Sequence, residues 1–392
     1  MPRNTDSILY SLDTNPSSEL SYGGFSRGGI WNIYPNTIGV PAGRNRGRFS
    51  TKQSLDNVQE RYWNKGLPMG MELELELPEG DNYYRQNDSV TEVMSLINKR
   101  LEEGMKHFAM RKGRDEYRYV TPVSAKGDGS LRNGVEFNFQ PMTTVAFRKY
   151  VATAFQDVGF SKFIGFNAPR AGIHIHIPKA AFSDVELYMY CILWHTLITS
   201  KSNGKSFSEM IGQRAFNQYN GRRLPFTDGM NTAPVGDKYY RVATDRASVA
   251  GKFNAFNYHG HGNTVEIRAF QSTQSPHRLI KNMAFVDNSW RYVHLLMDMV
   301  NDGNYYGALQ FLMNADMFAG YLTNPNMKGF NQHLAKFVRV HWRRGTQNRN
   351  RIFNSEQMRN IVSNMERVHT EFTSLEWEQH NTTETTEEAD NA

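Results

Sequence analysis

Residues 70–76 read Gly-Met-Glu-Leu-Glu-Leu-Glu, so acidic and apolar side chains alternate along this segment. Side chains at alternate positions of a β-strand share one face and lie about 6.5–7 Å apart. Glu72, Glu74 and Glu76 would therefore form an anionic row above an apolar underside. A helix would scatter the same side chains around its axis, so the segment predicts a strand with two chemically different faces.

Carboxylates aligned on one strand face repel one another, which raises the question of what neutralises them. A row of divalent cations, which prefer oxygen ligands, is one answer. The alternative is an acidic strand face exposed to water. This strand alone leaves both interpretations open, and the choice depends on the segments that follow it.

Length and composition indicate a globular protein. The chain has 392 residues, of which 39% are hydrophobic, enough for the core of one large domain or two ordinary ones. No apolar run approaches the roughly 18 residues of a membrane-spanning helix, and the first residues do not have the pattern of a signal peptide. We therefore expect a cytoplasmic protein without membrane association. Cys191 is the single cysteine, which excludes an intrachain disulfide framework or thiolate zinc site.

The charge distribution allows an anionic partner. The formal net charge of +6 and the isoelectric point near 9.2 suit a nucleotide, an acidic peptide or a nucleic acid without identifying one. Arginines crowd a basic stretch at 339–351 around Trp342, which could equally be a solvated helix end or loop. Residues 371–392 form an acidic tail, expected to be disordered from about residue 381 because it can bury little apolar surface.

Periodicity along the chain favours the α+β class. We expect an irregular arm rich in Gly, Asn and Arg at 1–66, a main domain at 67–300 and a helical extension at 301–370. Strand patterns occur at 69–77, 116–123, 134–140, 172–178, 253–259 and 263–270, and helical patterns at 89–110, 143–158, 184–199, 207–220, 276–301, 305–319 and 355–370. Several strands alternate and are therefore one-faced, which predicts an antiparallel sheet with helices packed on its outer face.

Two further strand patterns place reactive side chains on one face. In the first, His174 and His176 alternate with isoleucines, and two imidazoles on one face can bind an ion or an ion and its phosphate ligand. In the second, Glu266 and Arg268 share a face, which suits a metal-binding carboxylate beside a guanidinium for phosphate oxygens. The alternatives are an exposed histidine pair and a surface ion pair within one strand.

Two acids and a second histidine pair are less specific. Asp128 lies in a glycine turn, where aspartate commonly serves the turn itself. Glu136 lies within Val-Glu-Phe-Asn-Phe, and a carboxylate there either faces solvent or needs a cation. His259 and His261 fall in a glycine-rich stretch that suits a hairpin turn, so we interpret them as loop residues.

Common nucleotide and hydrolase motifs are missing from the sequence. Gly204-Lys205-Ser206 resembles the end of a P-loop, but Thr199 stands at the position of its first glycine. There is also no Gly-x-Ser-x-Gly elbow, no His-Glu-x-x-His helix and no dinucleotide-binding Gly-x-Gly-x-x-Gly after a strand.

Taken in order, these segments resemble the carboxylate-amine ligase superfamily, which includes glutamine synthetase and glutamate-cysteine ligase, and most closely the amidoligase family of phages and bacteria. The resemblance covers roughly residues 68–300. Its motifs are Gly70 to Glu74, Asp128-Gly129-Ser130 with Glu136, Gly172 to His176, Arg214 to Tyr219, Arg246, Asn257, and Thr264 to Arg268. Each motif is short, and their ordered combination is what carries the resemblance.

The resemblance implies a fold, two ions and a set of roles. The fold would be a curved antiparallel sheet forming a funnel, with ATP entering one end, the carboxylate substrate the other, and Mg²⁺ or Mn²⁺ between them. One ion would be held near the substrate carboxylate by Glu74, Asp128 and Glu136, and the other, bridging ATP phosphates, by Glu72, His174 and Glu266. Residues for phosphate, cofactor or substrate would be His176, Arg268, Arg246, Arg214 and Asn257.

The sequence departs from the family pattern in several places. Asp128 replaces the glutamate usual in glutamine synthetase, and Glu76 extends the acidic row beyond the motif. The arm at 1–66 and the segment beyond residue 300 have no counterpart that we can place.

The activity implied is ATP-dependent amide-bond formation through an acyl phosphate between a carboxylate substrate and an amine acceptor. The acceptor could be a small molecule, a peptide or protein, or a modified nucleobase, because fold and metal site do not determine it. Two alternatives are a phosphotransferase of the same broad fold and a non-catalytic virion or binding protein that retains it. The phosphotransferase alternative corresponds to the guanidino kinases, which share this broader fold. They need a reactive cysteine, and Cys191 in an apolar segment fits that role poorly.

Overall fold

The structure is a computed structural model, and it describes part of the chain. The described residues are 66, 67, 69–77, 109–112, 116–119, 123–128, 131, 134–144, 147, 148, 152, 155, 163–178, 181–215, 256–261, 264–343 and 353–370. Residues 1–65 of the predicted arm at 1–66 and the whole predicted tail at 371–392 lie outside this set.

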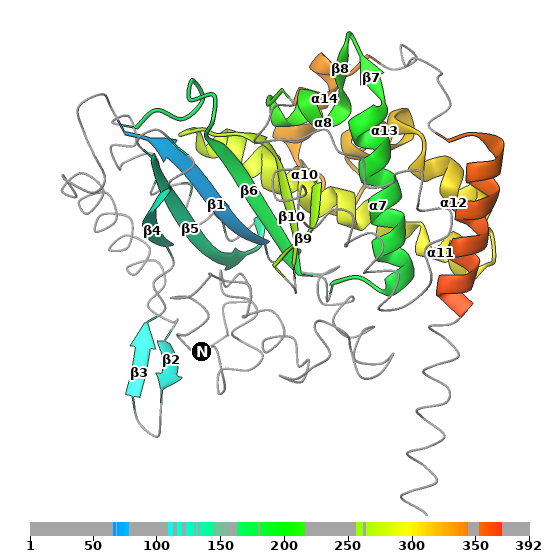
Figure 1. Ribbon diagram of the computed structural model, residues 1–392, viewed down its shortest axis with the longest axis horizontal. Coiled ribbons are helices and arrows are strands. Elements are labelled where there is room, and N and C mark those ends of the chain that lie inside the picture. The colour runs from blue at the N-terminus through cyan, green and yellow to red at the C-terminus, as the bar shows by residue number, and fades with distance from the viewer. Residues whose placement is uncertain are drawn as a thin grey trace, which may run out of the picture.

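One open antiparallel sheet dominates the fold (Figure 1). Its strands, in spatial order, are β4 (Val123–Asp128), β5 (Gly134–Met142), β1 (Met69–Glu76), β6 (Gly172–Pro178), β10 (Thr264–Gln271) and β9 (Phe256–His261). Every neighbouring pair is antiparallel. Two short hairpins lie outside the sheet, β2 (Ala109–Lys112) with β3 (Glu116–Tyr119) and β7 (Lys201–Ser202) with β8 (Lys205–Ser206). A mixed fold with an antiparallel sheet is thereby confirmed.

The apolar face of the sheet packs against helices. Ile173, Ile175 and Ile177 of β6 are fully buried in the same core as the helices α7 (Asp184–Thr199) and α10 (Pro276–Leu295). Phe270 of β10 meets Phe285 of α10 edge to face, with ring centroids 6.3 Å apart. Figure 1 shows α10 lying against one face of the sheet. The predicted alternation of β6 is therefore confirmed, because its isoleucines face the helices.

Local capping explains where α7 begins. Ser183 accepts the backbone N–H of Glu186, and the Glu186 carboxylate accepts the backbone N–H of Ser183, which forms a capping box. The other oxygen of the Glu186 carboxylate lies 2.7 Å from the Nδ1 atom of His294 on α10. One buried carboxylate thus caps α7 and connects it to α10.

Asparagines begin three of the shorter helices. These are α12 (Tyr305–Leu312), α13 (Ala315–Thr323) and α14 (Gln332–His341), capped by Asn304, Asn314 and Asn331, whose side chains accept first-turn backbone N–H groups. Further helices among the described residues are α8 (Phe207–Gly212), α11 (Met297–Asn301) and residues 355–370. Within these ranges, no helix combines the length and apolarity that crossing a bilayer requires.

Several predicted helix boundaries are wrong. The helix expected at 305–319 divides into α12 and α13, because Asn314 caps a new helix. The helix expected at 207–220 ends at Gly212, since Gln213 adopts a left-handed conformation with φ of 56°. Similarly, α10 ends at Leu295, and α11 continues to Asn301. The predicted helix at 143–158 falls mostly outside the described residues.

Three predictions that concern the strands also need correction. The strand expected at 116–123 divides into β3 and β4, and β2 occupies the end of the helix expected at 89–110, whose earlier part lies outside the described residues. His259 and His261 were interpreted as loop residues, whereas both belong to β9. Backbone pairing with β10 accounts for this, because His261 is the partner of Thr264.

Strand β10 contains a β-bulge beside Arg268. Ile267 pairs with Ile175, whereas Phe270 pairs with Ile173, so three steps along β10 match two steps along β6. The extra residue lets Ile267 and Phe270 both join the core although they are three positions apart. A strict alternation would have placed Phe270 on the polar face.

The end of α8 fits closely against this bulge. A Cβ atom at Gly212 would lie 1.8 Å from the carbonyl oxygen of Ala269, and Gln213 forms a β-bridge with Phe270. Glycine is therefore needed at position 212 because the two backbones approach each other too closely for a side chain.

We expect Gly212→Ala to lower the melting temperature by about 2–6 °C, since overpacking typically costs about 1–3 kcal/mol. The direction of the change in melting temperature is informative, because alanine in place of glycine in a helix with free space stabilises a protein by about 0.5–1 kcal/mol. Thermal unfolding followed by circular dichroism measures the change. An unchanged or higher melting temperature would contradict the close approach.

Candidate metal centre

Acidic and imidazole side chains gather on the polar face of three adjacent strands. Glu72 of β1 is the cross-strand partner of His174 of β6, and Glu266 of β10 is the partner of His176. Directly paired residues of antiparallel strands project from the same face, so these four side chains share one side of the sheet. The strand register therefore brings together the acidic and imidazole side chains of three separate sequence motifs.

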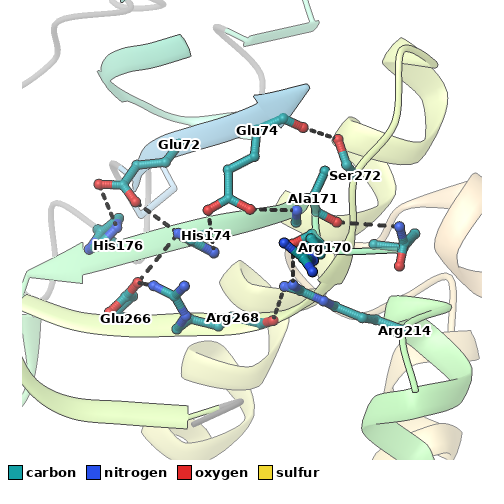
Figure 2. Close-up of polar contacts among 12 residues, drawn as sticks. Glu72, Glu74, Arg170, Ala171, His174, His176, Arg214, Glu266, Arg268 and Ser272 are labelled. Atoms are coloured by element: carbon teal, nitrogen blue, oxygen red, sulfur yellow. Dashed lines mark hydrogen bonds and ion pairs between the residues drawn. The ribbon is translucent and has the colours of Figure 1, made fainter. Parts of the chain in front are cut away.

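His174 lies at the centre of the cluster (Figure 2). Its Nδ1 atom is 2.8 Å from Oε2 of Glu72 and 3.5 Å from Oε1 of Glu266. Its Nε2 atom is 3.4 Å from Oε1 of Glu74. Three carboxylates from two strands thus converge on one imidazole.

The cluster has the composition and size of a cation site. One ligand atom from each of Glu72, His174 and Glu266 can be chosen so that all three lie within 4.8 Å of one another. The three residues are 8%, 1% and 2% exposed, respectively. Within the described part of the chain, this is the group that meets the geometric requirements of a metal site. It is also the set predicted from sequence to share one ion.

The second predicted ion site is described in part. Glu74 and Glu136 are paired across β1 and β5, and both side chains are buried. Their shared face follows from that pairing. Asp128, predicted as their third partner, ends β4 opposite Gly134, and its side chain lies outside the described residues. The structure thus brings together two of the three predicted ligands.

Arg268 binds directly to the cluster. Its Nη1 atom donates to Oε1 of Glu266 at 2.6 Å. Although burial lowers the pKa of the Arg268 guanidinium, the carboxylates of Glu266, Glu74 and Glu72 together raise that pKa above its ordinary value. Arg268 is therefore a permanent positive charge at the edge of the acidic cluster.

His176 occupies the other side of Glu72. Its Nε2 atom lies 3.7 Å from Oε1 of Glu72, and its side chain is fully buried. The two imidazoles of β6 thus flank one carboxylate, as expected for His-x-His on a strand face.

Arg214 is buried and binds main-chain groups. Its two terminal nitrogens donate to the carbonyl oxygens of Arg268 and Arg170, each at 3.1 Å. Burial lowers the pKa of the Arg214 guanidinium to about 10, with a smaller opposing effect of Glu74. It nevertheless remains protonated at neutral pH. Its predicted contact with phosphate or substrate stays a prediction.

The remaining predicted residues are described incompletely. Arg246 lies outside the described residues. Asn257 is paired with Glu266 across β9 and β10, so its Cα lies beside the cluster, but its side chain is outside the described part. Glu76 is only half-buried at the end of β1, beyond the convergence point.

Sequence reasoning missed two residues that support Glu74. The backbone N–H of Gly172 donates to Oε2 of Glu74 at 2.7 Å, and the hydroxyl of Ser272 donates to the carbonyl oxygen of Glu74. Neither residue belongs to an alternating polar pattern, so periodicity gave no indication of their roles. Gly172 was noted only as the first residue of the His-x-His motif.

The cluster brings charged groups of both signs into a buried space. Glu72, Glu74 and Glu266 contribute three carboxylates, which lie beside the guanidinium of Arg268 and the imidazoles of His174 and His176. Buried like charges are strongly unfavourable unless a counter-charge neutralises them. Carboxylate oxygens with one imidazole nitrogen suit a divalent cation such as Mn²⁺ or Mg²⁺. The donor set therefore fits the ion that the sequence resemblance implies.

Comparison of the sequence with models of protein families gives no match, and comparison with curated proteins gives no significant one. The functional inference therefore depends on the geometry of the cluster and on the ordered motifs of the sequence.

Proposed function

We propose that this protein is an ATP-dependent carboxylate-amine ligase of the amidoligase type, which forms an amide bond through an acyl phosphate. The observation that carries this proposal is the convergence of Glu72, His174 and Glu266, from three strands, beside the guanidinium of Arg268. The proposal includes the funnel-like curvature of the sheet and a catalytic domain at 67–300, both of which are inferred from the resemblance.

A cation site alone would be compatible with many functions, and Arg268 narrows them. A guanidinium held at 2.6 Å from a cation ligand can bind phosphate oxygens while the cation binds others of the same group. His176, buried on the other side of Glu72, would contact the same ligand. This combination suits an anionic phosphate ligand better than a purely structural ion.

The residues of the site would have separate roles in binding the cations and ATP. Glu72, His174 and Glu266 would hold one cation, and Glu74 with Glu136 would provide carboxylates for another. Bound ATP with its cations would supply an activated phosphoryl group for transfer to the substrate carboxylate.

Arg268 would neutralise charge on the oxygens of the group being transferred, and burial of its surroundings would strengthen that effect. No side chain has to form a covalent bond with the substrate. The side chains would therefore position the substrate and neutralise charge on the transferred group, and none of them would act as a nucleophile.

The test is product formation with Mg²⁺-ATP or Mn²⁺-ATP and a pool of amino acids, peptides and amines. We expect ADP and phosphate release that depends on the divalent cation, together with a product whose mass equals the sum of two substrates minus water. Glu76→Gln is a suitable control, because Glu76 lies on the same strand but beyond the cluster.

Other outcomes would point elsewhere. ADP release with a phosphorylated product would indicate the phosphotransferase alternative. Cation binding without nucleotide turnover across the substrate pool would indicate a binding protein that retains the fold.

A further inference from the structure

A single buried arginine connects the two halves of the candidate site. Arg214 is 2% exposed, and its guanidinium donates to the carbonyl oxygens of Arg268 and of Arg170. Arg268 belongs to the bulge of β10, whereas Arg170 precedes β6 by two residues. Figure 2 shows the Arg214 guanidinium between Arg268 and Arg170, with a dashed line to each. One planar group thus fixes the spacing between two backbone segments.

The first of these segments positions Arg268. A β-bulge interrupts regular pairing, so the backbone there depends on additional partners. The carbonyl of Arg268 finds one in the Nη1 atom of Arg214, and neighbouring Phe270 finds another in the bridge to Gln213. Contacts of residues 213 and 214 with the β10 backbone therefore set the direction in which the Arg268 side chain leaves the strand.

The second segment positions Glu74. Gly172 lies two residues after Arg170, and its backbone N–H donates to Oε2 of Glu74 at 2.7 Å. A Cβ atom at Gly172 would lie 2.0 Å from Nη1 of Arg214, so the guanidinium fills the space that any other residue would need. Arg214 and Gly172 therefore fit together as a unit, and that unit presents the N–H that orients Glu74.

We infer that Arg214 is a positioning residue, which holds Arg268 and Glu74 at the correct separation through main-chain carbonyls rather than by touching substrate. This inference rests on the proposed function in one respect only, that the carboxylates bind a divalent cation. It assigns a specific role to a residue that the sequence resemblance offered only as a candidate for phosphate or substrate.

Arg214→Lys is the first test. Lysine keeps the positive charge but presents one ammonium group, which cannot bridge two carbonyls with the geometry of a guanidinium. We expect the affinity for Mn²⁺, measured by electron paramagnetic resonance titration, to fall about 10-fold, the lower end for outer-shell partners of a metal site. We also expect faster amide hydrogen exchange in peptides covering 169–176 and 264–271.

Arg291→Lys is the matched control. Arg291 is another buried arginine, and it pairs with Asp287 one turn away on α10, the helix that packs against the apolar face of the sheet. Its substitution should lower thermal stability while leaving the Mn²⁺ affinity within about two-fold of wild type, because no ligand depends on it. This comparison separates positioning from a general loss of stability.

Gly172→Ala gives an independent test that leaves Arg214 in place. The new methyl group should displace the guanidinium and weaken Mn²⁺ binding as Arg214→Lys does. The double variant should bind Mn²⁺ no more weakly than the single variant that has the lower Mn²⁺ affinity, since both changes disturb the same contact.

The outcomes are distinguishable. Folded Arg214→Lys and Gly172→Ala proteins with wild-type Mn²⁺ affinity would overturn the inference. If wild-type protein itself failed to bind Mn²⁺, the cation site of the proposed function would be lost, and hydrogen exchange would decide the role of Arg214. Unchanged exchange in both peptides of Arg214→Lys would then overturn it as well.

Discussion

Glu72→Gln is expected to bind Mn²⁺ on the order of 100-fold more weakly than wild type, since a direct ligand should matter at least as much as an outer-shell partner. In the absence of divalent cations, the same variant should melt at the wild-type temperature or above it. Glutamine keeps a hydrogen-bonding group beside His174 but removes one negative charge from a buried cluster of carboxylates. Titration with Mn²⁺ and thermal unfolding with and without the cation measure both effects.

The stability measurement distinguishes this from a structural ion pair. If Glu72 and His174 formed a stabilising pair with no cation, removing one partner should cost about 3–5 kcal/mol and lower the melting temperature markedly. Wild-type protein should gain stability from added Mn²⁺ and the variant should not, because a ligand stabilises only the state that binds it. Glu76→Gln, on the same strand but half-buried, should behave as wild type in both assays.

Arg268→Lys is expected to lower ADP release on the order of 100-fold, equivalent to roughly 3 kcal/mol of transition-state stabilisation. Lysine preserves the charge beside Glu266 but lacks the planar fork that can bind two oxygens at once. The melting temperature should stay within a few degrees of wild type. Steady-state turnover with saturating ATP and thermal unfolding test the two statements together.

A purely structural role for Arg268 predicts a different pattern. Lysine would then largely replace it in the ion pair with Glu266, so turnover would be close to wild type. Arg268→Ala would mainly reduce stability. That combination of results would place Arg268 in the scaffold and weaken the ligase proposal.

The polar strand faces could be predicted because they depend only on the residues within each segment. Alternation in the segments of Glu72, His174 and Glu266 specifies both a strand and its two faces without reference to the rest of the chain. The same holds for α7, whose predicted bounds at 184–199 agree with the structure because Ser183 and Glu186 cap it locally. Where neighbouring residues decide the conformation, the sequence is sufficient.

Features that depend on distant partners could not be predicted in this way. The bulge at Arg268 arises from pairing with β6 and from contacts with the end of α8, and β10 itself reads as regular alternation. The role of Gly172 depends on Arg214, which follows it by more than forty residues in the sequence and meets it only in the folded chain. His259 and His261 were misread for a similar reason, since β10 draws their glycine-rich stretch into a strand.

The strand order also determines when the candidate site can exist during folding. Glu72 and His174 are 102 residues apart in the sequence, and β10, which brings Glu266, comes last in chain order among the described strands of the sheet. Two long loops must close before the three ligands meet, and chain entropy opposes each closure. Partly folded chains should therefore have almost no affinity for the cation. A bound ion would act late, slowing the unfolding of the finished sheet rather than accelerating its assembly.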